Sequence, residues 1–227
     1  MDELASGLGH KFAVHHKKNR LDVLAGLCDK HGSDKGEIKT SGHPYPWESH
    51  TYTDCYSRLF AHCRPHVKRV FECGLGTNNS NFGASMGADG KPGASLRVWR
   101  DYFPNAIVYG ADIDRDILFA EERIKTFYID QLDPMAISAF WGMVGAGDFD
   151  LMVDDGLHEF EAGTCLFTHS VQHLSQNGIY IIEDVGMSDL LRYAEFFSKM
   201  DYSVDYVTMF RQNVAVNGNN LIVIRRS

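Results

Sequence analysis

Four short apolar segments, each ending at acidic residues, constrain the fold of this chain more than any other feature of its sequence. They span residues 67–73, 107–111, 149–153 and 179–182. Each is rich in β-branched or aromatic residues and nearly free of polar ones, which is typical of strands buried on both faces of a sheet. Helix-like segments alternate with them, at residues 95–102, 134–143, 159–174 and 188–199. The alternation predicts right-handed βαβ units around a parallel sheet.

The C-terminal part of the chain breaks this alternation. Two strand-like segments, 202–208 and 221–225, flank a turn at residues 217–219, and the pattern predicts an antiparallel hairpin at one edge of the sheet. The chain has 227 residues, which is enough for one domain with a sizeable core but short for two. We therefore expect one main α/β domain.

The N-terminal part is less regular. Helical periodicity is found at residues 19–30 and 52–63. Residues 1–17 lack periodicity, and residues 31–51 are rich in Gly, Ser, His and Pro, as is typical of a loop. We expect an N-terminal arm with a lid or substrate loop over residues 1–50, followed by the main domain over residues 51–227.

Charge and apolar content exclude several classes of protein. With 22 basic and 30 acidic residues the formal net charge is −8, which argues against a general nucleic-acid-binding or anionic-membrane-binding protein. The only dense basic cluster is Lys17, Lys18 and Arg20. No segment approaches the ~20 apolar residues of a membrane span, and the polar N-terminus does not resemble a signal peptide. Five irregularly spaced cysteines suit a reducing cytoplasm, so we expect a cytoplasmic protein.

Acidic residues occur at the carboxyl ends of all four apolar segments. They are Glu72, Asp112, the pair Asp154 and Asp155, and the pair Glu183 and Asp184. Ligands of open α/β sheets bind outside the carboxyl ends of the strands, so these acids predict one shared functional crevice. For any single acid the alternative is a solvated strand end without a role.

A glycine-bearing turn follows the first segment. Gly74 and Gly76 would let the backbone approach a ligand closely, although a simple tight turn explains them equally well. The third glycine of the dinucleotide fingerprint is missing, which disfavours a site that grips a pyrophosphate. Asp112, at the end of the next segment, could accept hydrogen bonds from both hydroxyls of a ribose.

The segments ECGLGT (residues 72–77) and GADID (residues 110–114) together resemble the S-adenosylmethionine site of class I methyltransferases. The resemblance implies a Rossmann-like α/β fold with a mostly parallel seven-stranded sheet, a C-terminal antiparallel hairpin and helices on both faces. It also implies that the first loop holds the methionine part, Asp112 the ribose and Asp130 the adenine. The residues assigned to the cofactor on this basis are Asp34, Lys35, Glu72, Gly74, Gly76, Thr77, Asp112, Ile113, Asp130, Gln131 and Asp154.

Further segments resemble a metal-dependent branch of that family, which contains macrolide-sugar O-methyltransferases of the mycinamicin and tylosin type and cephalosporin-hydroxylase-like relatives. These segments are HGSDKG (31–36), GASLRVW (93–99), DDGLH (154–158) and IED (182–184). The chain departs from the branch at Leu157, where a serine is common. It is also shorter than the macrolide enzymes and carries a glycine-rich insertion at residues 78–91 of open role.

Transfer of a methyl group to oxygen requires that the acceptor hydroxyl be deprotonated or polarised. Asp155, Glu183 and Asp184 are expected to converge as oxygen ligands, a set that suits Mg²⁺. His158 is expected to act as the base beside Asp155. The alternatives are that Asp154 only caps the next helix, that Glu183 and Asp184 are solvated, and that His158 has no role.

These expectations converge on an S-adenosylmethionine-dependent, Mg²⁺-dependent O-methyltransferase that acts on a hydroxyl of a sugar or small natural product. A vicinal diol or hydroxy-carbonyl acceptor is favoured because it could chelate the metal. A metal-independent methyltransferase of the same fold and a non-catalytic S-adenosylmethionine-binding protein remain alternatives. No nucleic-acid or membrane partner is expected, and homo-oligomerisation is left open.

Overall fold

The computed structural model describes residues 12–16, 22–37, 45, 47–210 and 218–227 of the chain. Several predicted features lie outside the described residues: the basic cluster of Lys17, Lys18 and Arg20, the first residue of the predicted turn, Asn217, and residues 1–11, 17–21, 38–44 and 46 of the predicted N-terminal arm and loop. None of the helices in the described part of the chain has both the length and the apolar character needed to cross a membrane.

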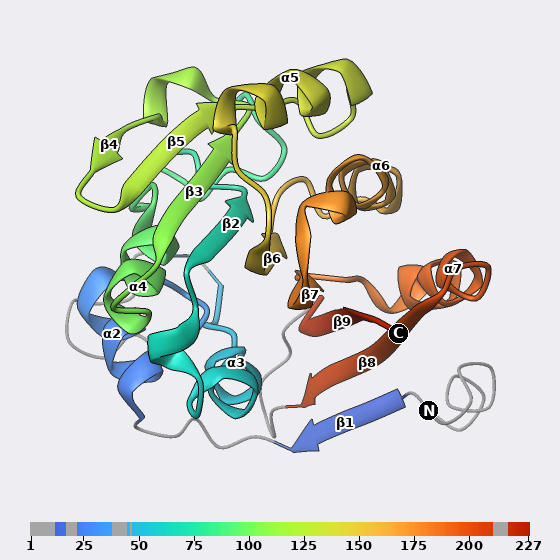
Figure 1. Ribbon diagram of the computed structural model, residues 1–227. Coiled ribbons are helices and arrows are strands. Elements are labelled where there is room, and N and C mark those ends of the chain that lie inside the picture. The colour runs from blue at the N-terminus through green and yellow to red at the C-terminus, as the bar shows by residue number, and fades with distance from the viewer. Residues whose placement is uncertain (1–11, 17–21, 38–44, 46, 211–217) are drawn as a thin grey trace.

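A nine-stranded sheet runs through the described part of the chain, in the order β1-β8-β9-β7-β6-β2-β3-β5-β4 (Figure 1). The strands are β1 (Phe12–His16), β2 (Arg69–Cys73), β3 (Ile107–Asp112), β4 (Ala120–Glu121), β5 (Ile124–Tyr128), β6 (Phe149–Asp154), β7 (Leu174–Ile182), β8 (Tyr202–Phe210) and β9 (Asn220–Arg226). Strands β5, β3, β2, β6 and β7 are parallel, whereas β9 runs antiparallel to both β7 and β8. The parallel core and the closing hairpin are therefore confirmed.

The expected count of seven strands is wrong, because a further strand extends each edge. Strand β1 pairs in parallel with β8, and the two-residue β4 pairs with β5. β1 lies in a segment without apolar periodicity, and β4 is too short to produce any. Both form through backbone hydrogen bonds to an edge strand, which requires no particular side-chain pattern.

Among the described residues, six α-helices cover the two faces of the sheet. They are α2 (Val23–His31), α3 (Thr53–Phe60), α4 (Ala94–Tyr102), α5 (Pro134–Val144), α6 (Phe160–Ser170) and α7 (Met187–Phe197). Asp22 is the N-cap of α2, and its carboxylate accepts from the N–H of Ala25. Gly32, in the left-handed conformation, is the C-cap. Helices α2 to α4 lie on one side of the sheet and α5 to α7 on the other (Figure 1).

Side chains that alternate along the central strands form a core on each face. Phe71 and Met152 pack with helices α5 to α7, whereas their neighbours Val70 and Leu151 pack with α2 to α4. Leu24 of α2 is fully buried in the second core. Helix α2 thus packs on the main sheet, and the division of the chain at residue 50 stays a prediction.

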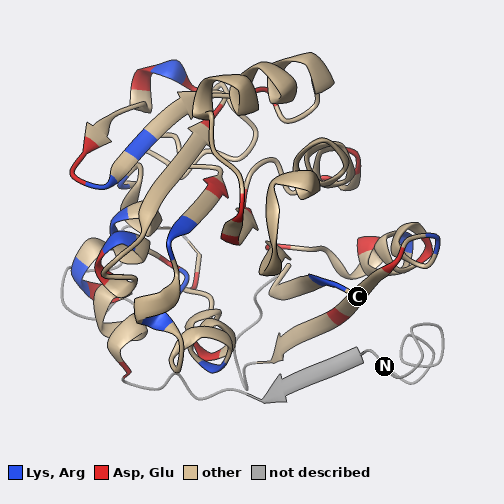
Figure 2. Ribbon diagram, viewed as in Figure 1, with Lys and Arg blue, Asp and Glu red and all other residues tan. Residues whose placement is uncertain are grey.

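The order of the strands creates a crevice beside β2. The chain proceeds from β2 to β3 and β5 on one side, and then returns to place β6 and β7 on the other. A reversal of this kind leaves an opening at the carboxyl ends of the strands, where ligands bind. Figure 2 shows an acidic residue near the tip of β2.

Candidate functional site

A cavity of about 850 Å³ opens at the carboxyl ends of β2, β3, β6 and β7. Most of the predicted site residues line it: Asp34, Lys35, Gly74, Gly76, Thr77, Asp112, Ile113, Asp130, Gln131, Asp155, His158, Glu183 and Asp184. Two others, Glu72 and Asp154, are buried behind its wall, with 0% and 3% of their surface exposed. The structure thus brings the predicted residues to one place, but not all of them face the ligand space.

Asp112 organises the glycine turn after β2. Its Oδ2 accepts from the N–H of Leu75 at 2.7 Å, and its Oδ1 accepts from the N–H of Asp114 at 2.8 Å. Burial raises the pKa of Asp112, and the backbone N–H donors partly offset that effect. Gly74 adopts φ +93°, a conformation that favours glycine. The turn that faces the cavity is therefore held in shape before any ligand binds.

The insertion at residues 78–91 forms another wall of the cavity. The Asn78 side-chain amide donates to the carbonyl oxygens of Gly87 and Gly90, at 2.7 and 2.9 Å, which closes the segment into a compact loop. The N–H of Met86 donates to the carbonyl oxygen of Thr77. Residues 82–86 consequently line the cavity opposite the strand ends.

Asp154 shapes the loop between β6 and α6. Its Oδ1 accepts from the Gln131 side-chain amide at 2.6 Å, and the amide oxygen of Gln131 accepts from the N–H of Leu157 at 2.9 Å. Burial raises the pKa of Asp154 to about 6. Glu159, not Asp154, occupies the N-cap position of α6, so the interpretation of Asp154 as the cap of that helix is wrong.

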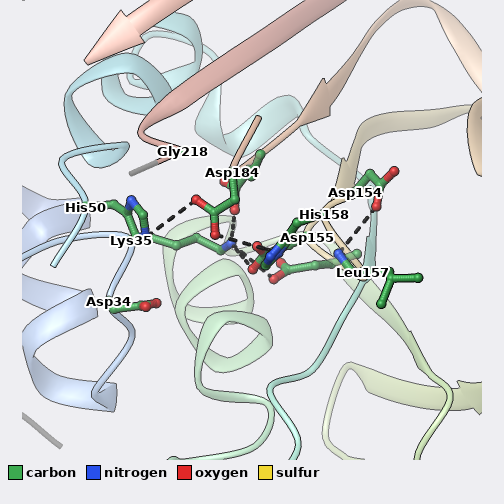
Figure 3. A network of polar contacts seen from close by, with 12 residues as sticks. Asp34, Lys35, His50, Asp154, Asp155, Leu157, His158, Asp184 and Gly218 are labelled. Carbon is green, nitrogen blue, oxygen red and sulfur yellow. Dashed lines mark hydrogen bonds and ion pairs between the residues drawn. The ribbon is translucent and has the colours of Figure 1, made fainter. Parts of the chain in front are cut away.

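Asp155, His158 and Asp184 form a compact cluster at the cavity wall (Figure 3). The His158 Nε2 lies 3.3 Å from Asp155 Oδ1 and 3.6 Å from Asp184 Oδ2. Burial lowers the pKa of His158, but the hydrogen bond to Asp155 and the charge of Asp184 outweigh it and raise that pKa to about 9. His158 and Asp184 both have positive φ, so the backbone is strained where it directs these side chains together.

Glu183 is oriented differently from its neighbour Asp184. Its side chain is 1% exposed, its Oε1 accepts from the Tyr56 hydroxyl at 2.6 Å, and its Oε2 accepts from the Lys35 ammonium. The Lys35 Nζ also lies 2.6 Å from Asp155 Oδ2 and 3.5 Å from Glu72 Oε1. Burial disfavours a charged lysine, but the three carboxylates raise the pKa of Lys35 well above its usual value. Burial raises the pKa of Glu183 and of Glu72, and repulsion from neighbouring acids adds to this effect.

Three residues that the sequence analysis did not select complete this network. The Tyr52 hydroxyl donates to Asp184 Oδ1 at 2.5 Å, and the His50 ring stacks on Tyr52 with 4.6 Å between ring centroids. Tyr56 binds Glu183 from the same helical segment. The spacing of four residues between Tyr52 and Tyr56 is a signal for one helix face, although such a pair is also typical of an ordinary core.

The donor atoms of the cluster suit a divalent cation. In the described part of the chain, Asp155, His158 and Asp184 each offer a ligand atom, and these atoms lie within 4.8 Å of one another. Three carboxylates contact the single ammonium group of Lys35, so the site carries an excess of negative charge in a poorly solvated place. Two carboxylates of this kind favour Mg²⁺ over softer metals.

Comparisons with known proteins show which proteins this chain resembles. No protein-family model matches the chain. It is 34% identical over 165 residues to 8-demethyl-8-α-L-rhamnosyl tetracenomycin-C 2′-O-methyltransferase of Streptomyces olivaceus, covering 73% of this chain and 38% of that protein. It is 32% identical over 184 residues to demethylmacrocin O-methyltransferase of Streptomyces fradiae, covering 79% of this chain and 44% of that protein.

A solved structure extends the comparison to almost the whole chain. MycE methyltransferase from the mycinamycin biosynthetic pathway, in complex with Mg, SAH and mycinamycin VI, superposes with a TM-score of 0.63 and 22% identity. The match covers 92% of this chain and 56% of MycE. The chain thus spans less than half the length of the two curated relatives above. It has the fold of the class I methyltransferases and is, over the aligned region, a homologue of the macrolide and sugar O-methyltransferases.

Proposed function

We propose that this chain is an S-adenosylmethionine-dependent O-methyltransferase that uses a divalent cation, most simply Mg²⁺, and methylates a hydroxyl of a sugar or a glycosylated small molecule. One observation carries the proposal: the cluster of Asp155, His158 and Asp184 shares a cavity with the glycine turn Gly74–Thr77 and with Asp112. An acid–base group and a cofactor cradle in one cavity are what methyl transfer to oxygen requires.

In this proposal Gly74, Gly76 and Thr77 hold the methionine part of the cofactor, while Asp112 and Ile113 hold the ribose and Asp130 and Gln131 the adenine. Lys35, Glu72 and Asp154 support these residues from behind or beside the wall, and Asp34 lines its edge. The Asp34 carboxylate accepts from the Trp47 indole N–H at 2.8 Å, which fixes that ring at the cavity.

His158, in its neutral form, takes the proton of the acceptor hydroxyl. A cation held by Asp155 and Asp184 would favour that form, because it would offset the carboxylate charges that raise the pKa of His158 to about 9. Its Nε2 faces Asp155 and Asp184, so these carboxylates orient the ring and stabilise the imidazolium that forms, while Nδ1 accepts the proton. Asp155 and Asp184 would also hold the metal, with Glu183 as a further ligand if its present contacts break. A bound divalent cation supplies Lewis acidity, which lowers the pKa of an acceptor hydroxyl.

The acceptor class rests on the relatives and on the shape of the cavity. The relatives are named for methylation of glycosylated natural products. In this chain Tyr45 and Trp47 stack with 5.2 Å between ring centroids and line the cavity, and such aromatic faces suit a sugar ring. A cytoplasmic location belongs to the same proposal and rests on the five irregularly spaced cysteines. The absence of nucleic-acid and membrane partners belongs to it as well and rests on the net charge of −8.

Two measurements test the proposal. Isothermal titration with S-adenosylhomocysteine should show binding to the wild type, and a screen of rhamnosides and related glycosides should show methyl transfer that EDTA abolishes. His158→Ala should bind S-adenosylhomocysteine as the wild type does but lose about 10²–10⁴-fold in turnover, whereas the control His66→Ala, at an exposed site, should lose nothing.

The outcomes separate the alternatives. Methyl transfer that survives EDTA would favour a metal-independent enzyme. Binding without turnover on any glycoside would favour a non-catalytic binding protein. The absence of S-adenosylhomocysteine binding would refute all three.

A further inference from the structure

The Lys35 side chain occupies an unusual position. Only 4% of it is exposed, and its ammonium group lies among the carboxylates of Glu72, Asp155 and Glu183. Figure 3 shows the Lys35 side chain reaching Asp155. Lysine is almost never fully buried unless it is paired, so these contacts hold it there. The same ammonium group contacts two residues that the proposed function assigns to the metal.

Lys35 and a metal ion are mutually exclusive at two atoms, Asp155 Oδ2 and Glu183 Oε2, whereas Asp155 Oδ1 and Asp184 Oδ2 face His158 instead. Nζ lies 2.6 Å from Asp155 Oδ2 and also contacts Glu183 Oε2. Mg²⁺ binds oxygen at about 2.0–2.1 Å. An ion that bridged the same two oxygens would therefore need the space that Nζ fills.

The side chain can leave without disturbing the backbone around it. The carbonyl oxygen of Lys35 accepts from the N–H of Thr53 at 3.1 Å, and that of Asp34 accepts from the N–H of His50 at 2.8 Å. These bonds fix the segment, while the ammonium is carried on a flexible four-carbon stem that lines the cavity.

The carboxylates keep other partners when the lysine leaves. Glu183 retains the Tyr56 hydroxyl on Oε1, and Asp155 retains His158 beside Oδ1. Displacement of Lys35 therefore breaks contacts of Lys35 alone, and the incoming ion meets ligands that are already oriented.

We propose that Lys35 is a tethered cation that occupies the metal-facing oxygens of Asp155 and Glu183 until a divalent ion displaces it, and that it thereby sets the affinity of the site for the ion. The inference rests on the metal site of the proposed function. It assigns Lys35 to regulation of that site and not to direct contact with the cofactor.

Titration of Mg²⁺ into EDTA-treated protein, followed by calorimetry and by thermal melting, tests this role. Lys35→Met keeps the length of the side chain and removes its charge. Because the ion no longer has to break a buried ion pair, the variant should bind Mg²⁺ at least about tenfold more tightly than the wild type. Without Mg²⁺ it should melt lower, and Mg²⁺ should raise its melting temperature by more than that of the wild type.

Lys199→Met is the matched control, because Lys199 is 70% exposed and pairs with Glu195 far from the cavity. It should bind Mg²⁺ as the wild type does. A second variant, Lys35→Arg, tests the inference if Lys35→Met does not fold. The guanidinium group is always charged and can bind two carboxylate oxygens at once, so it should hold the carboxylates more firmly and weaken Mg²⁺ binding.

Unchanged or weaker Mg²⁺ binding in Lys35→Met overturns the inference, as does unchanged binding in Lys35→Arg. A parallel titration with S-adenosylhomocysteine keeps the two proposals apart. If the wild type binds S-adenosylhomocysteine but Lys35→Met gains no Mg²⁺ affinity, only the role of Lys35 fails. If the wild type does not bind S-adenosylhomocysteine, the proposed function fails regardless of the metal result.

Discussion

Replacing Gly74 by alanine should damage both the stability of the protein and its cavity. A Cβ at this position would overlap the carbonyl group of Asp155, with its carbonyl carbon at 2.5 Å, and would lie 3.0 Å from the Cα of Gly156. Ordinary contact begins at 3.4 Å, so the carbonyl carbon would have to retreat by about 0.9 Å. The neighbour is backbone, so no side-chain rotation can relieve the overlap. The residue that would move is one of the two acids that contact His158.

Two energy terms contribute to this effect, and a second glycine separates them. The left-handed φ of Gly74 costs a residue with a Cβ about 1–2 kcal/mol, and the overlap adds about 1–3 kcal/mol. Gly87 has φ +76° with nothing within 4 Å of an added Cβ, so Gly87→Ala incurs the first term alone. At this chain length, Gly74→Ala should therefore melt roughly 2–12 °C below Gly87→Ala.

Thermal melting followed by circular dichroism measures this difference, and calorimetry with S-adenosylhomocysteine measures the damage to the cavity. We expect Gly87→Ala to bind as the wild type does and Gly74→Ala to bind at least about tenfold more weakly, the effect of a loss of 1.4 kcal/mol. Equal melting temperatures and equal affinities in the two variants would refute the close approach of the two backbones on which the reasoning depends.

Three further predictions concern regions outside the ligand space. Trp99→Phe removes the indole N–H that donates to the buried carboxylate of Glu72, and it should lower the free energy of unfolding in urea by about 1.5–3 kcal/mol, the range for a hydrogen bond to a charged group. Trp141→Phe loses only a hydrogen bond to the Ser170 hydroxyl and should cost about 0.5–1.5 kcal/mol. Equal losses in the two variants would contradict a charged Glu72. Burial lowers the pKa of His173, so the unfolded chain takes up a proton below pH 6.5 that the folded protein does not. The contribution of His173 to stability should consequently fall as the pH drops from about 7.5 to 5.5. The stability of the wild type relative to His173→Gln should therefore fall over this range, and a pH-independent difference would show that the imidazole is not desolvated. Asn78→Ala should speed proteolytic cleavage within residues 78–91 and change global stability little, and an unchanged digestion rate would show that the amide does not close the loop.

The interior of the fold could be predicted from the sequence because burial on both faces leaves a visible signature. The segments 67–73, 107–111, 149–153 and 179–182 are nearly continuous in apolar residues, and each ends at an acid. They lie in β2, β3, β6 and the C-terminal half of β7. Strands β1 and β4 could not be predicted in this way. They exist because an edge strand offers unpaired backbone groups, and a backbone hydrogen bond does not depend on which side chain is present.

The site was predicted in its location but not in its internal contacts. Strand topology places the strand-end acids around one crevice, and that follows from sequence order alone. The contacts of Lys35 with three carboxylates do not, because they join residues 35, 72, 155 and 183 through side chains whose directions no local pattern specifies. The same holds for Tyr52 and Tyr56, whose hydroxyls reach strand-end acids from a helical segment more than 120 residues away.

The two members of each acidic pair, Asp154–Asp155 and Glu183–Asp184, lie in different environments, a difference that the position of the pair at a strand end does not predict. Successive side chains of an extended chain point to opposite sides, so two adjacent acids at a strand end cannot share one environment. The first member of each pair, Asp154 or Glu183, is at most 3% exposed and is held by internal donors. The second member, Asp155 or Asp184, has a side chain that is 25% or 20% exposed and lies beside His158. Each pair thus contains one acid that is buried and held by internal donors and one that is partly exposed beside His158. The buried acids differ in turn, because Asp154 lies behind the cavity wall whereas Glu183 also lines the cavity.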